Sequence, residues 1–140
     1  MITTADLVEI TDLVARYDLA ADDGRADDWA ATWTDDGVWD GGFLVVEGRA
    51  ALRDFNARLH VDDEFAAFRG SHHVGANFHV EETGPDEARL VHDNLILFVK
   101  PEGVWLMTTA EYDDVVRRVD GRWLFARRRW RPVPDDGGAA

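Results

Sequence analysis

Histidine and carboxylate side chains are the residues of this chain best suited to moving protons. The sequence holds five His residues among 28 Asp and Glu residues. A histidine held by a carboxylate is a useful base near neutral pH, because the carboxylate fixes its tautomer and stabilises the imidazolium ion. His72 and His73 are adjacent, so in a β-strand they point to opposite faces. Only one of the two can face an interior cavity, and alternation would place Gly75, Asn77 and His79 on the face of His73.

Metal and thiol chemistry have little support in the sequence. The chain has no Cys, which excludes a thiol nucleophile, a disulfide bond and a thiolate metal site. The remaining histidines form no His-Glu-x-x-His zinc motif. We therefore predict no metal site.

The first half of the chain must position these groups with helices. Apolar residues recur at steps of three and four from Leu7 to Ala21, and Thr3 and Gly24 are typical of the start and end of such a helix. Tyr17 lies on this stripe and is expected to face inward, either as a substrate contact or as a core residue. Further elements expected here are a helix over 27–33, a strand over 38–40, a helix over 49–59 and a solvated loop over 61–65, a candidate lid.

From residue 71 onward the sequence predicts strands. Runs rich in β-branched and aromatic residues are separated by hairpin signals at Gly84-Pro85, at 101–103 and at Asp120-Gly121. The predicted strands span 73–80, 88–100, 104–119 and 123–133. Helices followed by antiparallel strands indicate an α+β fold with a curled sheet capped by the N-terminal helices. We expect one domain over residues 1–133 and a flexible tail over 134–140.

Alternation along the strands indicates which side chains face the interior. A small-molecule pocket needs an apolar wall with a few placed polar groups, and one face of each long strand carries such residues. The predicted wall residues on the strands are Asn94, Ile96, Thr108, Tyr112, Arg128 and Trp130.

The polar members of this wall have candidate roles and also structural alternatives. Asn94 and Tyr112 are candidates for hydrogen bonds to a substrate oxygen. Arg128 is suited to holding a carboxylate or to stabilising a leaving group or an enolate, and equally to a salt bridge with one of the many carboxylates. Ile96 and Trp130 are as well explained by core packing.

The charge balance limits the partners. Fifteen basic residues against 28 acidic ones give a formal net charge of −13, which repels nucleic acid and anionic bilayers. No apolar run approaches the roughly 20 residues needed to cross a bilayer, and we see no signal peptide. The sequence predicts a cytoplasmic protein whose partner is a small molecule, with no nucleic-acid or membrane partner.

The spacing of several motifs resembles the SnoaL-like branch of the nuclear transport factor 2-like superfamily. The motifs are Tyr17-x4-Asp22-x6-Trp29-x3-Trp33-x-Asp35-Asp36-Gly37-x-Trp39, then His73-x3-Asn77, and then Tyr112-x-Asp114 with Asp120-Gly121-Arg122-Trp123 and Arg128. The resemblance implies a cone-shaped, curved, mixed or antiparallel sheet around a pocket, with no metal or organic cofactor. It also implies a homodimer or homotrimer.

Within that branch, Asp22 and His73 resemble the catalytic pair of scytalone dehydratase, bile-acid 7α-dehydratase and hexachlorocyclohexane dehydrochlorinase. The resemblance implies that His73 is the base and that Asp22 orients it, although an Asp near a helix end is often only a solvated terminus. The spacing to Asn77 favours His73 over His72, and Trp39 resembles a pocket-wall aromatic of the dehydrochlorinase.

The function that follows is a cofactor-free lyase, a dehydratase or a related β-eliminating enzyme. Its expected substrate is a small, largely apolar cyclic molecule such as a steroid, a terpene or an aromatic polyketide. Two alternatives stay open: an isomerase or polyketide cyclase on the same scaffold, and a domain that binds a small molecule without turnover.

Overall fold

The fold is a curved, mixed six-stranded sheet packed against helices. The computed structural model describes residues 1–133, and the tail predicted over 134–140 lies outside the described residues. The helical elements are α1 (Thr4–Asp22), α2 (Ala26–Ala30), α3 (Arg49–Leu59) and the 3₁₀ helix η1 (Asp63–Phe68). The strands are β1 (Trp33–Asp40), β2 (Val45–Glu47), β3 (Ser71–Gly84), β4 (Glu87–Lys100), β5 (Gly103–Val119) and β6 (Arg122–Val133).

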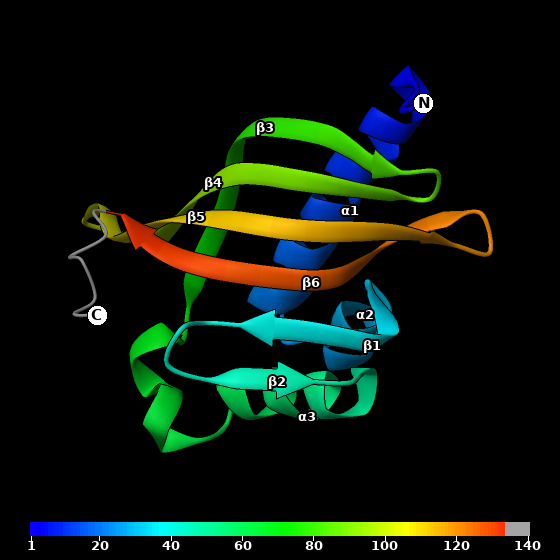
Figure 1. Cartoon of the computed structure of the whole chain (residues 1–140). Coiled ribbons are helices and arrows are strands. Elements are labelled where there is room, and N and C mark those ends of the chain that lie inside the picture. The colour runs from blue at the N-terminus through cyan, green and yellow to red at the C-terminus, as the bar shows by residue number, and fades with distance from the viewer. Residues whose placement is uncertain (134–140) are drawn as a thin grey trace.

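The sheet has the strand order β2-β1-β6-β5-β4-β3 (Figure 1). Neighbouring strands are antiparallel except β1 and β6, which are parallel. In Figure 1, α1 crosses behind the long strands, while α2 and α3 lie beside β1 and β2. The N-terminal helices therefore cover one face of the sheet, as the sequence predicted.

The start of α1 is fixed by a capping box. The backbone N–H of Asp6 donates to Oγ1 of Thr3 at 3.2 Å, and the backbone N–H of Thr3 donates to Oδ2 of Asp6 at 2.8 Å. These two bonds satisfy donors that a helix start would otherwise leave unpaired. The helix then buries one apolar face, which includes Ile10, Val14 and Tyr17.

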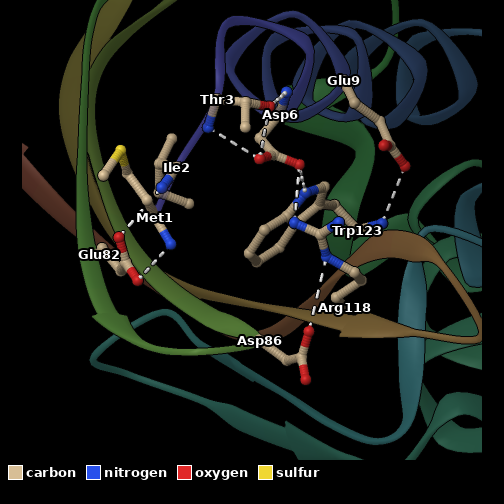
Figure 2. Close-up of polar contacts among 9 residues, drawn as sticks. All are labelled: Met1, Ile2, Thr3, Asp6, Glu9, Glu82, Asp86, Arg118 and Trp123. Carbon is tan, nitrogen blue, oxygen red and sulfur yellow. Dashed lines mark hydrogen bonds and ion pairs between the residues drawn. The ribbon is translucent and has the colours of Figure 1, made fainter.

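The same carboxylate joins the helix start to the sheet (Figure 2). The indole N–H of Trp123 donates to Oδ1 of Asp6 at 3.0 Å, and Arg118 donates to the same oxygen at 2.8 Å. One turn later, Glu9 accepts the backbone N–H of Trp123 at 2.9 Å. The bond from Trp123, followed by those from Thr3, holds the pKa of Asp6 far below its usual value.

An aromatic cluster packs the helices onto the sheet. The rings of Tyr17, Trp29, Trp33 and Phe125 contact one another with centroids 5.1 to 5.9 Å apart. Aromatic pairs at such distances contribute about 0.5–1.5 kcal/mol each beyond the area they bury. The cluster fixes Tyr17 on α1 relative to β1 and β6.

Two elements differ from the sequence prediction in the segment before α3. The predicted helix over 27–33 ends at Ala30, and Trp33 instead begins β1, where it pairs with Phe125 of β6. Pairing with a distant strand therefore overrides the local preference for helix. The three-residue strand β2 was not predicted, because three residues are too few to show alternation. The helix predicted over 49–59 is confirmed as α3.

Candidate functional site

The candidate site is a cavity of about 490 Å³ between the sheet, α1, α3 and η1. We call it the main cavity. Its surface is largely apolar and aromatic. The residues predicted for the pocket that line it are Tyr17, Trp39, His73, Ile96, Thr108, Tyr112 and Trp130.

Asp22 and His73 meet at the edge of the main cavity. Nδ1 of His73 lies 2.6 Å from Oδ1 of Asp22, and the backbone N–H of His73 donates to Oδ2 at 3.0 Å. Asp22 is the last residue of α1 and its side chain is 9% exposed, so the helix end delivers the carboxylate to the start of β3. A carboxylate accepts, so Nδ1 carries the proton and Nε2 is left to take one.

His72 lies on the other side of β3. Its side chain is 55% exposed against 20% for His73. Its Nδ1 is 3.8 Å from Oδ2 of Asp22, too far for a hydrogen bond. The pair that can do acid–base chemistry is therefore Asp22 with His73.

Two tyrosine hydroxyls belong to the wall of the main cavity. Tyr17 and Tyr112 are both buried. Burial raises the pKa of Tyr112 to about 12, against the opposing effect of Arg128. Burial, followed by the proximity of Tyr112, also raises the pKa of Tyr17 well above its usual value. Both hydroxyls therefore stay protonated at neutral pH and can donate hydrogen bonds.

Arg128 lies behind this wall and not in it, which corrects the sequence prediction. The side chain is fully buried and does not line the main cavity. Its Nε lies 3.1 Å from both oxygens of Asp114, and its guanidinium carbon is 4.2 Å and 4.0 Å from the ring centroids of Tyr17 and Tyr112. Nη2 donates to Nε2 of His92 at 2.7 Å. The structural alternative, a salt bridge, is the arrangement observed.

Asn94 is the other predicted wall residue that the main cavity does not reach. Its side chain is fully buried, opposite Gly75 on β3 and Ala110 on β5. Within residues 1–133, neither amide atom has a hydrogen-bond partner. The prediction of its strand face was right, but the position lies deeper than the wall.

A bulge in β3 overturns the predicted neighbours of His73. The register shifts between Ala76 and His79, and Asn77 adopts a positive φ of 55°. Asn77 is exposed and donates to Oδ2 of Asp93 at 2.7 Å, while Phe78 stacks on His92 with centroids 5.1 Å apart. An extra residue in a strand reverses the alternation after it, so Asn77 and His79 do not share the face of His73.

Several lining residues were not predicted from the sequence. They come from the loop after β1, from α3, from η1 and from β5, and the main ones are Phe43, Phe55, Asn56, Leu59, Phe65, Phe68 and Met107. The periodic apolar face of α3 was a usable signal for Phe55 and Leu59. Of the segment predicted as a loop over 61–65, residues 63–65 instead begin η1, whose Phe65 packs on Phe55 at 6.0 Å between centroids.

Two further properties of the described residues bear on function. Between residues 1 and 133, no three or more His, Cys, Asp or Glu side chains are grouped so that they could hold a metal ion. In the same part of the chain, no helix combines the length and the apolar character that crossing a membrane requires.

Comparisons with known proteins agree with this geometry. A model of the SnoaL-like domain matches residues 3–129, and no curated protein sequence matches the chain. A protein of unknown function with a cystatin-like fold from Nostoc punctiforme PCC 73102 is 28% identical, with a TM-score of 0.81 and coverage of 95% of both chains. LinA is 26% identical, with a TM-score of 0.75 and coverage of 91% of this chain and 86% of its own.

A third solved structure supports the fold alone. It is an NTF2-like protein with a cystatin-like fold from Novosphingobium aromaticivorans, 23% identical, with a TM-score of 0.78 and coverage of 99% of this chain and 94% of its own. The family model spans nearly all of the described residues, including Asp22 and His73. The chain therefore belongs to the SnoaL-like domain family.

Proposed function

We propose that the protein is a cofactor-free lyase in which His73 removes a proton from a small, largely apolar cyclic substrate. The observation that carries the proposal is the 2.6 Å contact between Nδ1 of His73 and Oδ1 of Asp22 at the edge of the main cavity. A general base must be held in one tautomer with its second nitrogen free. Membership of the SnoaL-like family supports a small-molecule-processing enzyme at the family level.

The proposed step is a β-elimination. Nε2 of His73 takes a proton from a substrate carbon, and the electron pair of that C–H bond forms a C=C bond. The bond between the neighbouring carbon and the leaving group breaks, and the leaving group departs with that electron pair. Asp22 stabilises the imidazolium ion that forms. In a dehydration the imidazolium returns its proton to the departing hydroxide, so the products are the alkene and water.

The main cavity supports the proposed substrate class. Its volume of about 490 Å³ lies within the range of pockets for drug-sized molecules. Aromatic rings of Trp39, Phe55 and Trp130 line it, and these suit the flat or fused rings of a steroid, a terpene or an aromatic polyketide. The hydroxyls of Tyr17 and Tyr112 are suited to hold a substrate oxygen.

We also propose a cytoplasmic homodimer or homotrimer, which is what the family resemblance implies. An assembly would cover the apolar side chains that are exposed near the β4–β5 hairpin, Val99, Val104, Trp105 and Leu106. The absence of Cys is consistent with a reducing compartment.

The second candidate function is an isomerase or cyclase at the same site. The two protonated tyrosine hydroxyls favour it, because hydrogen-bond donors stabilise an enolate that keeps all of its groups. The mass of the product separates the two readings. An elimination product is lighter than the substrate by the leaving group, whereas an isomer has the same mass.

The test uses a panel of hydroxylated steroids, terpenoids and aromatic polyketides, with products identified by mass spectrometry. We expect one class to lose water in the presence of the protein. His73→Ala should reduce this turnover by about a hundredfold or more, the usual contribution of a general base. His72→Ala is the matched control, because His72 is adjacent but neither lines the main cavity nor lies within hydrogen-bond distance of Asp22. Full turnover by His73→Ala would overturn the proposal, and so would binding of panel members without any product.

A further inference from the structure

A second cavity of about 320 Å³ lies between α1 and β3. We call it the α1–β3 cavity. Its inner part is lined by Asp18, His73 and Gly75, and its mouth by the exposed residues Thr11, Ala15 and Leu19. His73 also lines the main cavity. The proposed base therefore borders two separate spaces, one on the substrate side and one on the helix side.

Asp18 is a buried carboxyl group that the proposed elimination does not use. It lies one helical turn before Asp22, so both carboxyls face β3. Asp22 meets His73, whereas Asp18 lies over Gly75, with Oδ2 3.5 Å from the position that a Cβ on Gly75 would take. Within the described part of the chain, its buried Oδ1 has no hydrogen-bond partner.

The surroundings favour the protonated form of this carboxyl. Burial raises the pKa of Asp18, and the nearby Asp22 raises it further. Arg128 on β6, His73 on β3 and His92 on β4 act in the opposite direction without cancelling the effect of burial. Asp18 is therefore a buried, incompletely hydrogen-bonded carboxyl group that binds a proton more readily than a free Asp, and it shares a cavity with His73 of the proposed catalytic pair.

Gly75 keeps the α1–β3 cavity open. A Cβ at this position would lie 3.0 Å from the ring of Phe78 and 3.4 Å from the side chain of Val14. The first distance is tighter than ordinary packing, so the Phe78 ring would have to shift, whereas the distance to Val14 is an ordinary contact. The backbone φ of Gly75 is not in the left-handed region, so the space that it leaves is the reason why glycine suits this position.

We propose that the α1–β3 cavity is a proton-exchange port for the His73–Asp22 pair and that Asp18 passes protons between the pair and water that enters the cavity. The proposal rests on the proposed role of His73 as a base. A proton from the substrate arrives at Nε2, and the proton on Nδ1 moves through Asp22 and a water molecule to Asp18. Asp18 then gives a proton to solvent, so one proton leaves the pair and no electrons are transferred.

The port matters most for one class of leaving group. A departing hydroxide takes the proton of the imidazolium with it as water, so a dehydratase would reset without a second exit. A leaving group that departs as a stable anion, such as a halide or a carboxylate, does not carry the proton away. The imidazolium must then lose its proton by another route, and the port supplies one that avoids the substrate in the main cavity.

The test follows the ring N–H of His73 by NMR in protein labelled with ¹⁵N-histidine. Asp18→Asn keeps the size and polarity of the side chain but cannot take up or release a proton. We expect exchange of the His73 ring proton with water to slow by about a hundredfold, the lower end of the range for a lost acid–base group. Asp12→Asn is the matched control, since Asp12 is exposed on the same helix and pairs with Arg16.

A second variant tests the cavity without changing the acid. Ala15→Leu places a larger side chain at the mouth and keeps a good helix former on an exposed position. We expect it to slow the exchange as well, with little change in thermal stability. If the His73 ring proton exchanges at the wild-type rate in both Asp18→Asn and Ala15→Leu, the α1–β3 cavity is not a proton-exchange port.

Turnover distinguishes this failure from failure of the proposed function. For a substrate with an anionic leaving group, Asp18→Asn should lower the steady-state kcat and leave the first turnover unchanged, because only the resetting step is affected. A purely structural role for Asp18 would slow both. If His73→Ala abolishes turnover while Asp18→Asn changes neither exchange nor kcat, the port is wrong and the lyase stands. If His73→Ala keeps turnover, the lyase itself is wrong.

Discussion

Arg128 is a buried cation whose position depends on one carboxylate and two aromatic rings. It pairs with Asp114, which is also fully buried, and lies between Tyr17 and Tyr112. His92 completes the arrangement: its Nδ1 donates to the backbone carbonyl of Asp93 at 3.1 Å and its Nε2 accepts from Arg128. Helix α1 and strands β4, β5 and β6 therefore meet around one buried charged centre.

Removing one member of this charged centre should lower the stability of the fold. Arg128→Met leaves the Asp114 carboxylate buried without its partner, and breaking such a pair costs about 3–5 kcal/mol. We expect the free energy of unfolding, measured by urea denaturation, to fall by that amount. The matched control is Arg89→Met, because Arg89 pairs with Asp113 at 2.8 Å but its side chain is 47% exposed. That change should cost less than about 1 kcal/mol.

A double variant checks the cause. Arg128→Met combined with Asp114→Leu removes both charges, so most of the lost stability should return. If the double variant is as unstable as Arg128→Met, the cost comes from packing against the tyrosines and not from the unpaired carboxylate.

At the scale of elements, the join between α1 and the sheet should make stability depend on pH. The pKa of Asp6 is held below its usual 3.8, chiefly by the hydrogen bond from Trp123. A lowered carboxyl pKa contributes stability above pH 3.8, and that contribution is lost as the pH falls through the lower, folded-state pKa. Asp6→Asn should therefore lower Tm at pH 7 and flatten the decrease of Tm below pH 4.

Thermal unfolding of both proteins between pH 7 and pH 2.5 or so would check this prediction. Asp12→Asn again serves as a control, since Asp12 lies on the same helix in an exposed pair with Arg16. An equal loss of Tm at all pH values in Asp6→Asn would show that the capping geometry matters and that the ionisation of Asp6 does not.

The elements show how far the sequence alone could reach. The bounds of α3 and the presence of the long strands followed from apolar periodicity and hairpin signals, which are local properties. The bulge at Asn77 was not predicted, because it depends on pairing with β4. It moves Phe78 into the position that strict alternation gave to Asn77. The beginning of β1 at Trp33 also depends on a distant partner, Phe125.

The candidate site, like the elements, was predictable from the sequence only in part. Alternation was sufficient to identify strand residues that line the main cavity, including Ile96, Thr108 and Tyr112. Depth was not predictable, because alternation assigns a face and not a distance from the cavity. Asn94 and Arg128 are on the expected face but lie behind the wall. Asp18 carries no sequence signal beyond its spacing to Asp22, since its burial comes from packing against β3.

At the scale of the whole molecule, the excess of acidic residues should dominate the response to salt. The formal net charge is −13. Each exposed ion pair stabilises the fold by less than about 1 kcal/mol, so the protein loses little stability when salt weakens these pairs. It also screens the repulsion among the remaining carboxylates, because the Debye length falls from about 10 Å at 0.1 M to about 3 Å at 1 M. The screening of this repulsion should be the larger effect, so added salt should stabilise the protein.

We therefore expect Tm to rise by a few degrees when NaCl is raised from roughly 0.05 M to roughly 0.5 M. This shift corresponds to a gain of about 1 kcal/mol in the free energy of unfolding. Differential scanning calorimetry in NaCl and in KCl would measure the effect, and equal shifts in both salts would exclude binding of one particular cation. A Tm that falls as salt is added would mean that the surface ion pairs outweigh the net repulsion.

The position of β6 in the sheet limits the order in which the strands can assemble as the chain is synthesised. This strand lies between β1 and β5 (Figure 1) and, among the strands of residues 1–133, is the only one that joins β1 to β3, β4 and β5. A nascent chain emerging from the ribosome thus has no sheet for β1 and β2 to join until residues 122–133 are available. Until then Tyr17 and Trp33 lack Phe125, and their apolar faces are exposed to chaperones or to other chains.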